Sequence, residues 1–156
     1  FTISSMMETL YTNKFLRAIS KPFMDLDKIT ASASPSPNRW SDKVPSREMT
    51  VEEIHHFIDA FALCSKMLKD AGVDGVEVHA VHEGYLLDQF TLRYVNKRTD
   101  DYGGSFENRY RFPVEIGKPI KKEFGEDFPV SLRYSVISKT KSFHTPYTPA
   151  YYMHPL

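Results

Sequence analysis

The strongest constraint on the fold is the alternation of two amphipathic helical stretches with two short strand-like runs between residues 50 and 134. The sequence predicts a helix from Thr50 to about Gly72, followed by a strand over 75–79. A second predicted helix, 106–124, leads into a second predicted strand, 129–134. Because a helix separates the two strands, they are expected to pair in parallel through a right-handed crossover. The sequence therefore predicts an α/β fold, although two strands alone are too few for a stable sheet.

Each predicted helix carries one apolar stripe. The first opens with a capping box, Thr50 to Glu53, and its expected buried stripe is Val51, Ile54, Phe57, Ile58, Phe61, Cys64 and Leu68. The stripe expected for the second is Phe106, Tyr110, Val114, Gly117, Ile120 and Phe124, although Pro113 and Pro119 each remove an internal hydrogen bond. A weak pattern over 6–19 is compatible with a short helix. Prolines predict a loop over 30–49, and the absence of an apolar period predicts irregular structure from 138.

Composition restricts the class of protein. The hydrophobic fraction of 41% in 156 residues is that of a globular domain. Lys plus Arg and Asp plus Glu number 20 each, so no net charge attracts nucleic acid or an acidic membrane surface. No apolar run approaches the roughly 18 residues of a membrane span, and no secretory signal pattern is present, so a cytoplasmic location is expected. The single cysteine, Cys64, excludes an intrachain disulfide and is expected to pack in the helix stripe.

Titratable side chains follow both predicted strands. His79, His82 and Tyr85 come at and after the end of the first, and Arg133 lies near the end of the second. Parallel α/β folds build their sites at these strand ends. Imidazoles can stabilise a developing oxyanion, and a phenol can act as a general acid. The alternatives are structural histidines, a packing tyrosine and a surface arginine. A metal site of His79, His82 and Glu83 is a further alternative, without the spacing of a helical zinc motif.

Several strings occur in order between residues 30 and 141: SPNRW, REMTVEEI, GVEVHAVHEGYLLDQF, NKRTDDYGGSFENRYRFPVEI and FPVSLRYS. Together they resemble the Old Yellow Enzyme family of NADH:flavin oxidoreductases and ene-reductases, especially the branch of 2-enoate reductases and bile-acid-type dehydrogenases. The resemblance implies a partial TIM (β/α)8 barrel, from the loop after strand 3 to strand 5. Residues 22–141 are then the partial barrel, 1–21 an unassigned N-terminal segment and 142–156 an irregular tail.

The resemblance also implies a chemistry. FMN is the expected cofactor, NADH or NADPH the reductant, and a small unsaturated carbonyl compound, such as an enone or enoate, the substrate. His79 and His82 resemble the pair that binds the substrate carbonyl, Tyr85 the proton donor, and Arg133 the arginine beside the flavin pyrimidine. Glu83 is an additional residue relative to the commonest H-x-x-H-G-Y pattern, so a local bulge is needed for His79 and Tyr85 to keep their positions.

The polar residues between Asn96 and Arg111 match a loop and helix start that the family shares, and a structural role is expected for them. A whole barrel needs about 250 residues. The isolated chain is therefore expected to be an incomplete oxidoreductase that self-associates through its open edges, with an inert remnant lacking flavin as the alternative.

Overall fold

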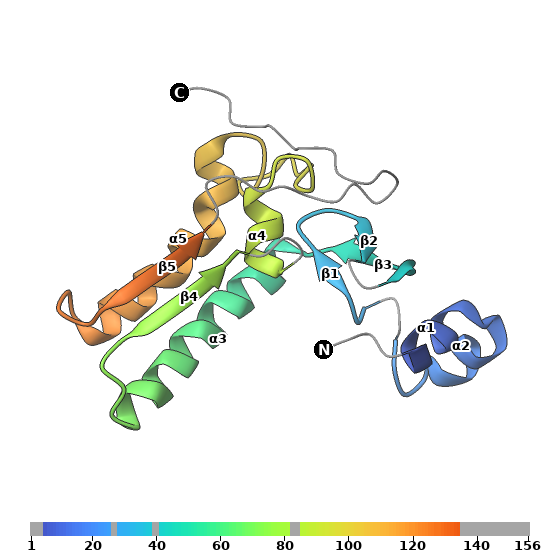
Figure 1. The fold of residues 1–156 in the computed structure, drawn as a ribbon, viewed down its shortest axis with the longest axis horizontal. Helices are drawn as coiled ribbons and strands as arrows, with labels where there is room; N and C mark the ends of the chain where they lie inside the picture. The colour runs from blue at the N-terminus through green and yellow to red at the C-terminus, as the bar shows by residue number, and fades with distance from the viewer. Residues whose placement is uncertain (1–4, 26–27, 39–40, 82–84, 135–156) are drawn as a thin grey trace.

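The computed structural model describes residues 5–25, 28–38, 41–81 and 85–134. The C-terminal part of these ranges is an α/β unit (Figure 1). Helix α3 (Val51–Asp70) leads into β4 (Val76–Ala80), and helix α5 (Phe106–Phe124) leads into β5 (Val130–Tyr134). Strands β4 and β5 pair in parallel, with Val76 opposite Val130 and His79 opposite Arg133. The predicted helix–strand–helix–strand order and the parallel pairing are confirmed.

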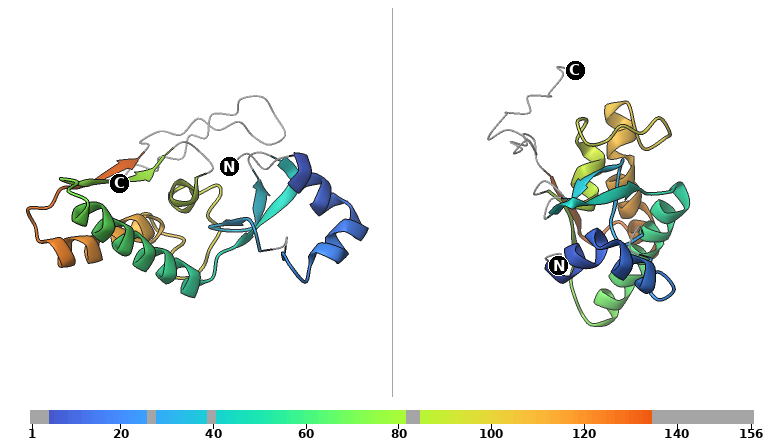
Figure 2. Two further views of the ribbon diagram at one scale, coloured as in Figure 1. Left: turned by 90° about the horizontal axis from the view of Figure 1, so that it is seen from below. Right: turned by 90° about the vertical axis from the view of Figure 1, so that its right-hand side faces the viewer.

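Both long helices lie on one face of the β4–β5 sheet (Figure 2). Strand alternation turns Val78 and Ala80 toward these helices, and both are buried. The core cluster between the layers contains Ala33, Met49, Ile54, Ile58, Val78, Ala80, Leu87, Phe90, Tyr102, Phe112, Ile116, Ile120 and Phe128. On the other face of the sheet, among the described residues, the polar side chains of both strands are exposed.

The predicted helix faces are partly wrong. Ile54 and Ile58 are buried as expected, but Phe57, Cys64 and Leu68 are exposed. In α5 the buried residues are Phe112, Pro113, Ile116 and Ile120, whereas Phe106 and Val114 are exposed. The predicted stripes are wider than the surface that the described core covers, so each helix has apolar residues left over along its side. Cys64 is therefore a surface thiol, and its predicted packing role is wrong.

Helix α5 continues through Pro113 and Pro119. Each proline costs about 3 kcal/mol in a helix interior. Burial of Phe112, Ile116 and Ile120, each 0% exposed, contributes about 1.5–3 kcal/mol per side chain and offsets that cost. The helix ends at Gly125, whose φ of 83° lies in the left-handed region that glycine tolerates.

The predicted loop over 30–49 is wrong in part, because it contains strands. β1 (Ala31–Ser32), β2 (Ser36–Asn38) and β3 (Ser41–Glu48) form a small sheet in the order β1-β3-β2. Pro37 lies opposite Pro45 in the antiparallel β2–β3 pair, so the two residues that lack a backbone N–H face each other. Ahead of this sheet, α1 (Ser5–Thr12) and α2 (Lys14–Ser20) pack together, and Asn13 caps α2. The short helix suggested for 6–19 is thus two helices.

One further element is absent from the sequence prediction. Helix α4 (Leu86–Thr91) lies in the long connection between β4 and α5 (Figure 1). Four of its six residues, Leu87, Asp88, Phe90 and Thr91, are buried. The run LLDQF has too few turns for a helical period to be recognised.

Candidate functional site

The open face of the β4–β5 sheet carries the predicted strand-end residues. Alternation places Glu77 and His79 of β4 and Ser131 and Arg133 of β5 on the exposed side. His79 and Arg133 are partners in the parallel register, so their side chains leave the same edge of the sheet as neighbours. The predicted proximity of these two residues is therefore seen in the structure.

Arg133 forms an ion pair with Glu77. Its Nη2 lies 3.1 Å from Oε1 and 3.4 Å from Oε2 of the carboxylate. The two side chains are 54% and 46% exposed, which limits such a pair to about 0–1 kcal/mol. In the described part of the chain Glu77 engages only Nη2, so Nε and Nη1 can donate to a ligand.

Tyr85 returns to the same region after the connection that follows β4. It is the N-cap residue of α4 and is 51% exposed. Its ring meets the His79 ring edge to face, with 5.6 Å between centroids and 75° between planes. His79 and Tyr85 are thus brought together, with Arg133 on the neighbouring strand. His82 and Glu83, including the bulge expected there, lie outside the described residues.

A polar cluster around Arg98 contains residues for which the sequence predicted only a structural role. The guanidinium of Arg98 is 2% exposed and donates to the carbonyls of Ala33 and Met49 and to the carboxylate of Asp100. The Arg98 hydrogen bonds lower the pKa of Asp100 below its usual range. A Cβ on Gly103 would lie 2.2 Å from the Arg98 carbonyl oxygen, so this close approach requires glycine.

Tyr102 joins this cluster to both long helices. Its hydroxyl donates to Oε2 of Glu115 at 2.8 Å and lies 3.1 Å from Nε2 of His55. Burial, and then the hydrogen bond to the Glu115 carboxylate, raise the pKa of Tyr102 well above its usual range. Tyr102 is therefore a neutral group that links the cluster to α3 and α5. The sequence offered no signal that pairs His55 with Tyr102, because 47 residues separate them.

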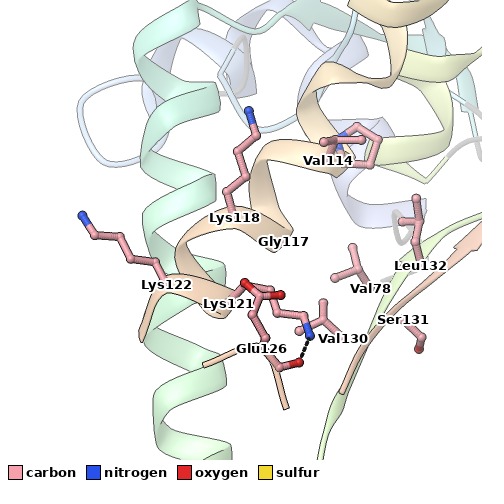
Figure 3. Close-up of a pocket in the computed structure, with 11 residues that line it drawn as sticks. Val78, Val114, Gly117, Lys118, Lys121, Lys122, Glu126, Val130, Ser131 and Leu132 are labelled. Carbon is pink, nitrogen blue, oxygen red and sulfur yellow. Dashed lines mark hydrogen bonds between the residues drawn. The ribbon is translucent and has the colours of Figure 1, made fainter. Parts of the chain in front are cut away.

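A pocket of about 500 Å³ lies between the β4–β5 sheet and α5 (Figure 3), and neither His79 nor Arg133 lines it. Val78, Val130 and Leu132 point into it from the strands, facing Val114 and Gly117 of α5. Lys118, Lys121 and Lys122 surround it. The Nζ of Lys121 donates to the Glu126 carbonyl at 2.7 Å. This mostly apolar groove follows the open side of β5 and α5 and is separate from the strand-end residues.

Metal and membrane sites receive no support from the described ranges. No group of three His, Cys, Asp or Glu side chains there is arranged to hold a metal ion. The alternative site of His79, His82 and Glu83 rests on two residues outside those ranges. None of the described helices is both long and apolar enough to cross a membrane.

Two proteins of known name are similar to this chain in sequence. Cinnamate reductase of Clostridium sporogenes is 52% identical over 116 residues, which cover 74% of this chain and 17% of that protein. 12-Oxophytodienoate reductase 2 of Arabidopsis thaliana is 46% identical over 83 residues, which cover 53% of this chain and 22% of that protein. The chain thus spans about a fifth of the length of these relatives.

Solved structures agree with the sequence matches. A complex of 2-naphthoyl-CoA reductase matches with a TM-score of 0.61 and 45% identity, over 66% of this chain and 16% of that chain. Old Yellow Enzyme from Pichia sp. AKU4542 matches with a TM-score of 0.56 and 40% identity, over 62% of this chain and 25% of that chain. These neighbours are Old Yellow Enzyme-like TIM barrels, and the described residues form a partial α/β piece of that kind without a closed barrel. The model of the NADH:flavin oxidoreductase / NADH oxidase family matches residues 14–153, and the chain belongs to this family.

Proposed function

We propose that this chain forms part of an FMN-dependent oxidoreductase that uses NADH or NADPH to reduce an activated alkene. The observation that carries the proposal is the placement of His79, which is the register partner of Arg133 in the parallel strands and whose ring contacts the ring of Tyr85. β4 and β5 then correspond to barrel strands 4 and 5, and the open polar face of the sheet lines the barrel interior. A soluble, cytoplasmic protein that binds neither nucleic acid nor membrane fits this assignment.

FMN is the cofactor that family membership implies, with NAD(P)H as reductant. The residues present fit one part of it. Arg133 offers an exposed cation at a strand end, and its Nε and Nη1 can donate to the oxygens and nitrogens of a flavin pyrimidine. When bound, FMN supplies the hydride that is transferred to the alkene. A fixed cation beside the pyrimidine favours the negatively charged reduced flavin.

His79 and Tyr85 supply the polar groups for the substrate. An exposed imidazole at the end of β4 can donate an N–H to a substrate carbonyl and stabilise the negative charge that develops on its oxygen. The Tyr85 hydroxyl can hold the proton that is passed to the α-carbon. His82 is proposed as a second carbonyl donor from its sequence position. Cinnamate, 12-oxophytodienoate and 2-naphthoyl-CoA, named in the relatives, all place a carbonyl beside unsaturated carbon, so an enoate or enone is the proposed substrate class.

Flavin titration tests the proposal directly. The chain is mixed with FMN, and the visible spectrum and flavin fluorescence are recorded after desalting. Retained FMN with a shifted visible band supports the proposal, and weaker retention by Arg133→Gln would assign the arginine. The matched control is Arg93→Gln, a change at an exposed arginine outside the strand-end residues.

A second experiment tests the chemistry in a complete barrel. The 116 residues that match cinnamate reductase replace the corresponding segment of that protein, and reduction of cinnamate by the chimera is measured with His79→Ala and Tyr85→Phe. Full activity of both variants would contradict the assigned roles. A folded chimera that binds no FMN would contradict the function itself.

A further inference from the structure

Helix α4 determines where Tyr85 lies. Tyr85 is its N-cap residue, and the Tyr85 carbonyl accepts the Gln89 N–H at 3.0 Å. The Tyr85 side chain makes no capping hydrogen bond to the helix. Leu87 and Phe90, 4% and 0% exposed, anchor the helix in the core. Because a rigid element transmits its own placement to a side chain at its end, a shift of α4 moves the Tyr85 ring relative to His79.

The C-terminal end of α4 is held by two polar side chains from outside the helix. Nδ2 of Asn96 donates to the Phe90 carbonyl at 2.7 Å, and Nε of Arg109 donates to the Thr91 carbonyl at 3.0 Å. These carbonyls are among those that a helix leaves without internal partners. Asn96 is 4% exposed, so its bonds form where water does not compete.

Asn96 also fixes the segment that follows α4. Its Nδ2 donates to the Tyr102 carbonyl at 2.8 Å, and its Oδ1 accepts the Arg98 N–H at 3.0 Å. Both amide hydrogens and the amide oxygen are therefore used. No apolar residue of similar size could replace these three bonds, and aspartate would lose both donated ones.

We propose that Asn96 and Arg109 are positioning residues that hold Tyr85 against His79 by fixing α4 from its C-terminal end. This proposal rests on the proposed function, because the position of Tyr85 matters to catalysis only if Tyr85 is the proton donor. The contact itself can be measured without flavin or substrate.

The test uses two matched pairs of variants. Asn96→Ala is compared with Asn108→Ala, since the Asn108 side chain accepts its hydrogen bond from Arg111 of the same helix and not from α4. Arg109→Lys is compared with Arg111→Lys, since Nε of Arg111 also donates to a carbonyl, at 2.7 Å, but to that of Asp101. The readouts are the nuclear Overhauser effect between the His79 and Tyr85 rings, and the ¹⁹F shift of 3-fluorotyrosine at position 85.

The proposal expects Asn96→Ala and Arg109→Lys to lose at least half of the ring-to-ring Overhauser effect and to shift the ¹⁹F signal, while both controls retain the values of the unmodified chain. A purely structural role would lower the melting temperature and leave the ring contact unchanged in the folded protein, and that result would overturn the proposal. If Asn96→Ala does not fold, the Arg109→Lys and Arg111→Lys pair decides. An unchanged rate for Tyr85→Phe in the chimera would count against the proposed function and leave the contact result intact.

Discussion

Arg98 has its charged group inside the protein and reaches three segments of the chain. It donates to the carbonyls of Ala33 and Met49 at 3.1 and 2.6 Å and forms a forked pair with Asp100. Residues 33, 49 and 100 are far apart in sequence, so one guanidinium joins the small sheet, the start of α3 and the loop before α5. A buried charge whose three guanidinium nitrogens all donate hydrogen bonds is costly to disrupt, because its removal leaves several partners unpaired.

Replacing Arg98 should therefore destabilise the whole fold. Arg98→Ala is expected to lower the free energy of unfolding by about 3 kcal/mol, since two buried carbonyls lose their donors and Asp100 loses its partner. Arg98→Lys should lose less, because it keeps the charge but not the fork. Urea unfolding followed by circular dichroism measures both. The exposed Arg93 provides the control, and a loss in Arg93→Ala equal to that in Arg98→Ala would contradict the assigned role.

Sequence reasoning at the scale of single residues succeeded where a strand fixed the geometry. The pairing of His79 with Arg133 follows from two parallel strands of similar length, both visible as apolar runs. The approach of Tyr85 to His79 could not be derived in the same way, because it depends on α4 and on hydrogen bonds from Asn96 and Arg109. The catalytic roles of His79 and Tyr85 and the flavin-binding role of Arg133 stay predictions.

At the scale of elements, the start of α3 shows how local sequence sets a helix end. Thr50 Oγ1 accepts a hydrogen bond from the Glu53 N–H at 3.1 Å. The Glu53 carboxylate in turn accepts one from the Thr50 N–H at 2.9 Å. Arg47 adds a forked ion pair to the same carboxylate, with contacts of 2.7 and 2.6 Å. The capping box could be predicted because it is local. The Arg47 pair could not, because the region before α3 was predicted to be a loop.

Protonation of the Glu53 carboxylate should lower the free energy of unfolding at acidic pH. The Arg47 hydrogen bonds, followed by the Thr50 N–H, lower the pKa of Glu53 to about 2. Because the Glu53 pKa is lower in the folded than in the unfolded state, the ionised carboxylate stabilises the fold fully above the unfolded pKa of about 4.3. This stabilisation is lost as pH falls toward 2. Glu53→Gln is therefore expected to flatten the fall in unfolding free energy between pH 5 and pH 2. Glu52→Gln, an exposed change in the same turn, should keep the slope of the unmodified chain.

Removing the cap hydroxyl is a separate change. Thr50→Ala should lower the unfolding free energy by about 1 kcal/mol at pH 7, because the Glu53 N–H loses its acceptor. Thr50→Ser, which keeps the hydroxyl, is the matched control. Amide exchange at Glu53 localises the effect, and unchanged protection of that N–H in Thr50→Ala would contradict it.

At the scale of the whole molecule, the α/β unit is apolar along both sides. Phe57, Cys64 and Leu68 are exposed on α3, and Val114 borders the groove between α5 and β5. These are the residues for which the sequence predicted burial. The helical period predicted correctly that they belong to apolar faces, but one chain segment cannot reveal whether a neighbour covers them. In a barrel the adjacent strand–helix units cover both sides of such a piece.

The open groove leads to a prediction about assembly. The 156-residue polypeptide on its own is expected to self-associate, because an apolar groove lies beside β5, a strand that pairs only with β4 among the described residues. Val114, 51% exposed at the groove, is the residue to change, since an aspartate there introduces a charge that cannot be buried against a second copy. Val114→Asp should shift the species distribution toward monomer in sedimentation velocity across a concentration series.

Val51→Asp, at an exposed valine in the first turn of α3, introduces the same charge away from the groove and should leave the distribution unchanged. A monomer at every concentration for the unmodified chain would show that the groove does not cause association.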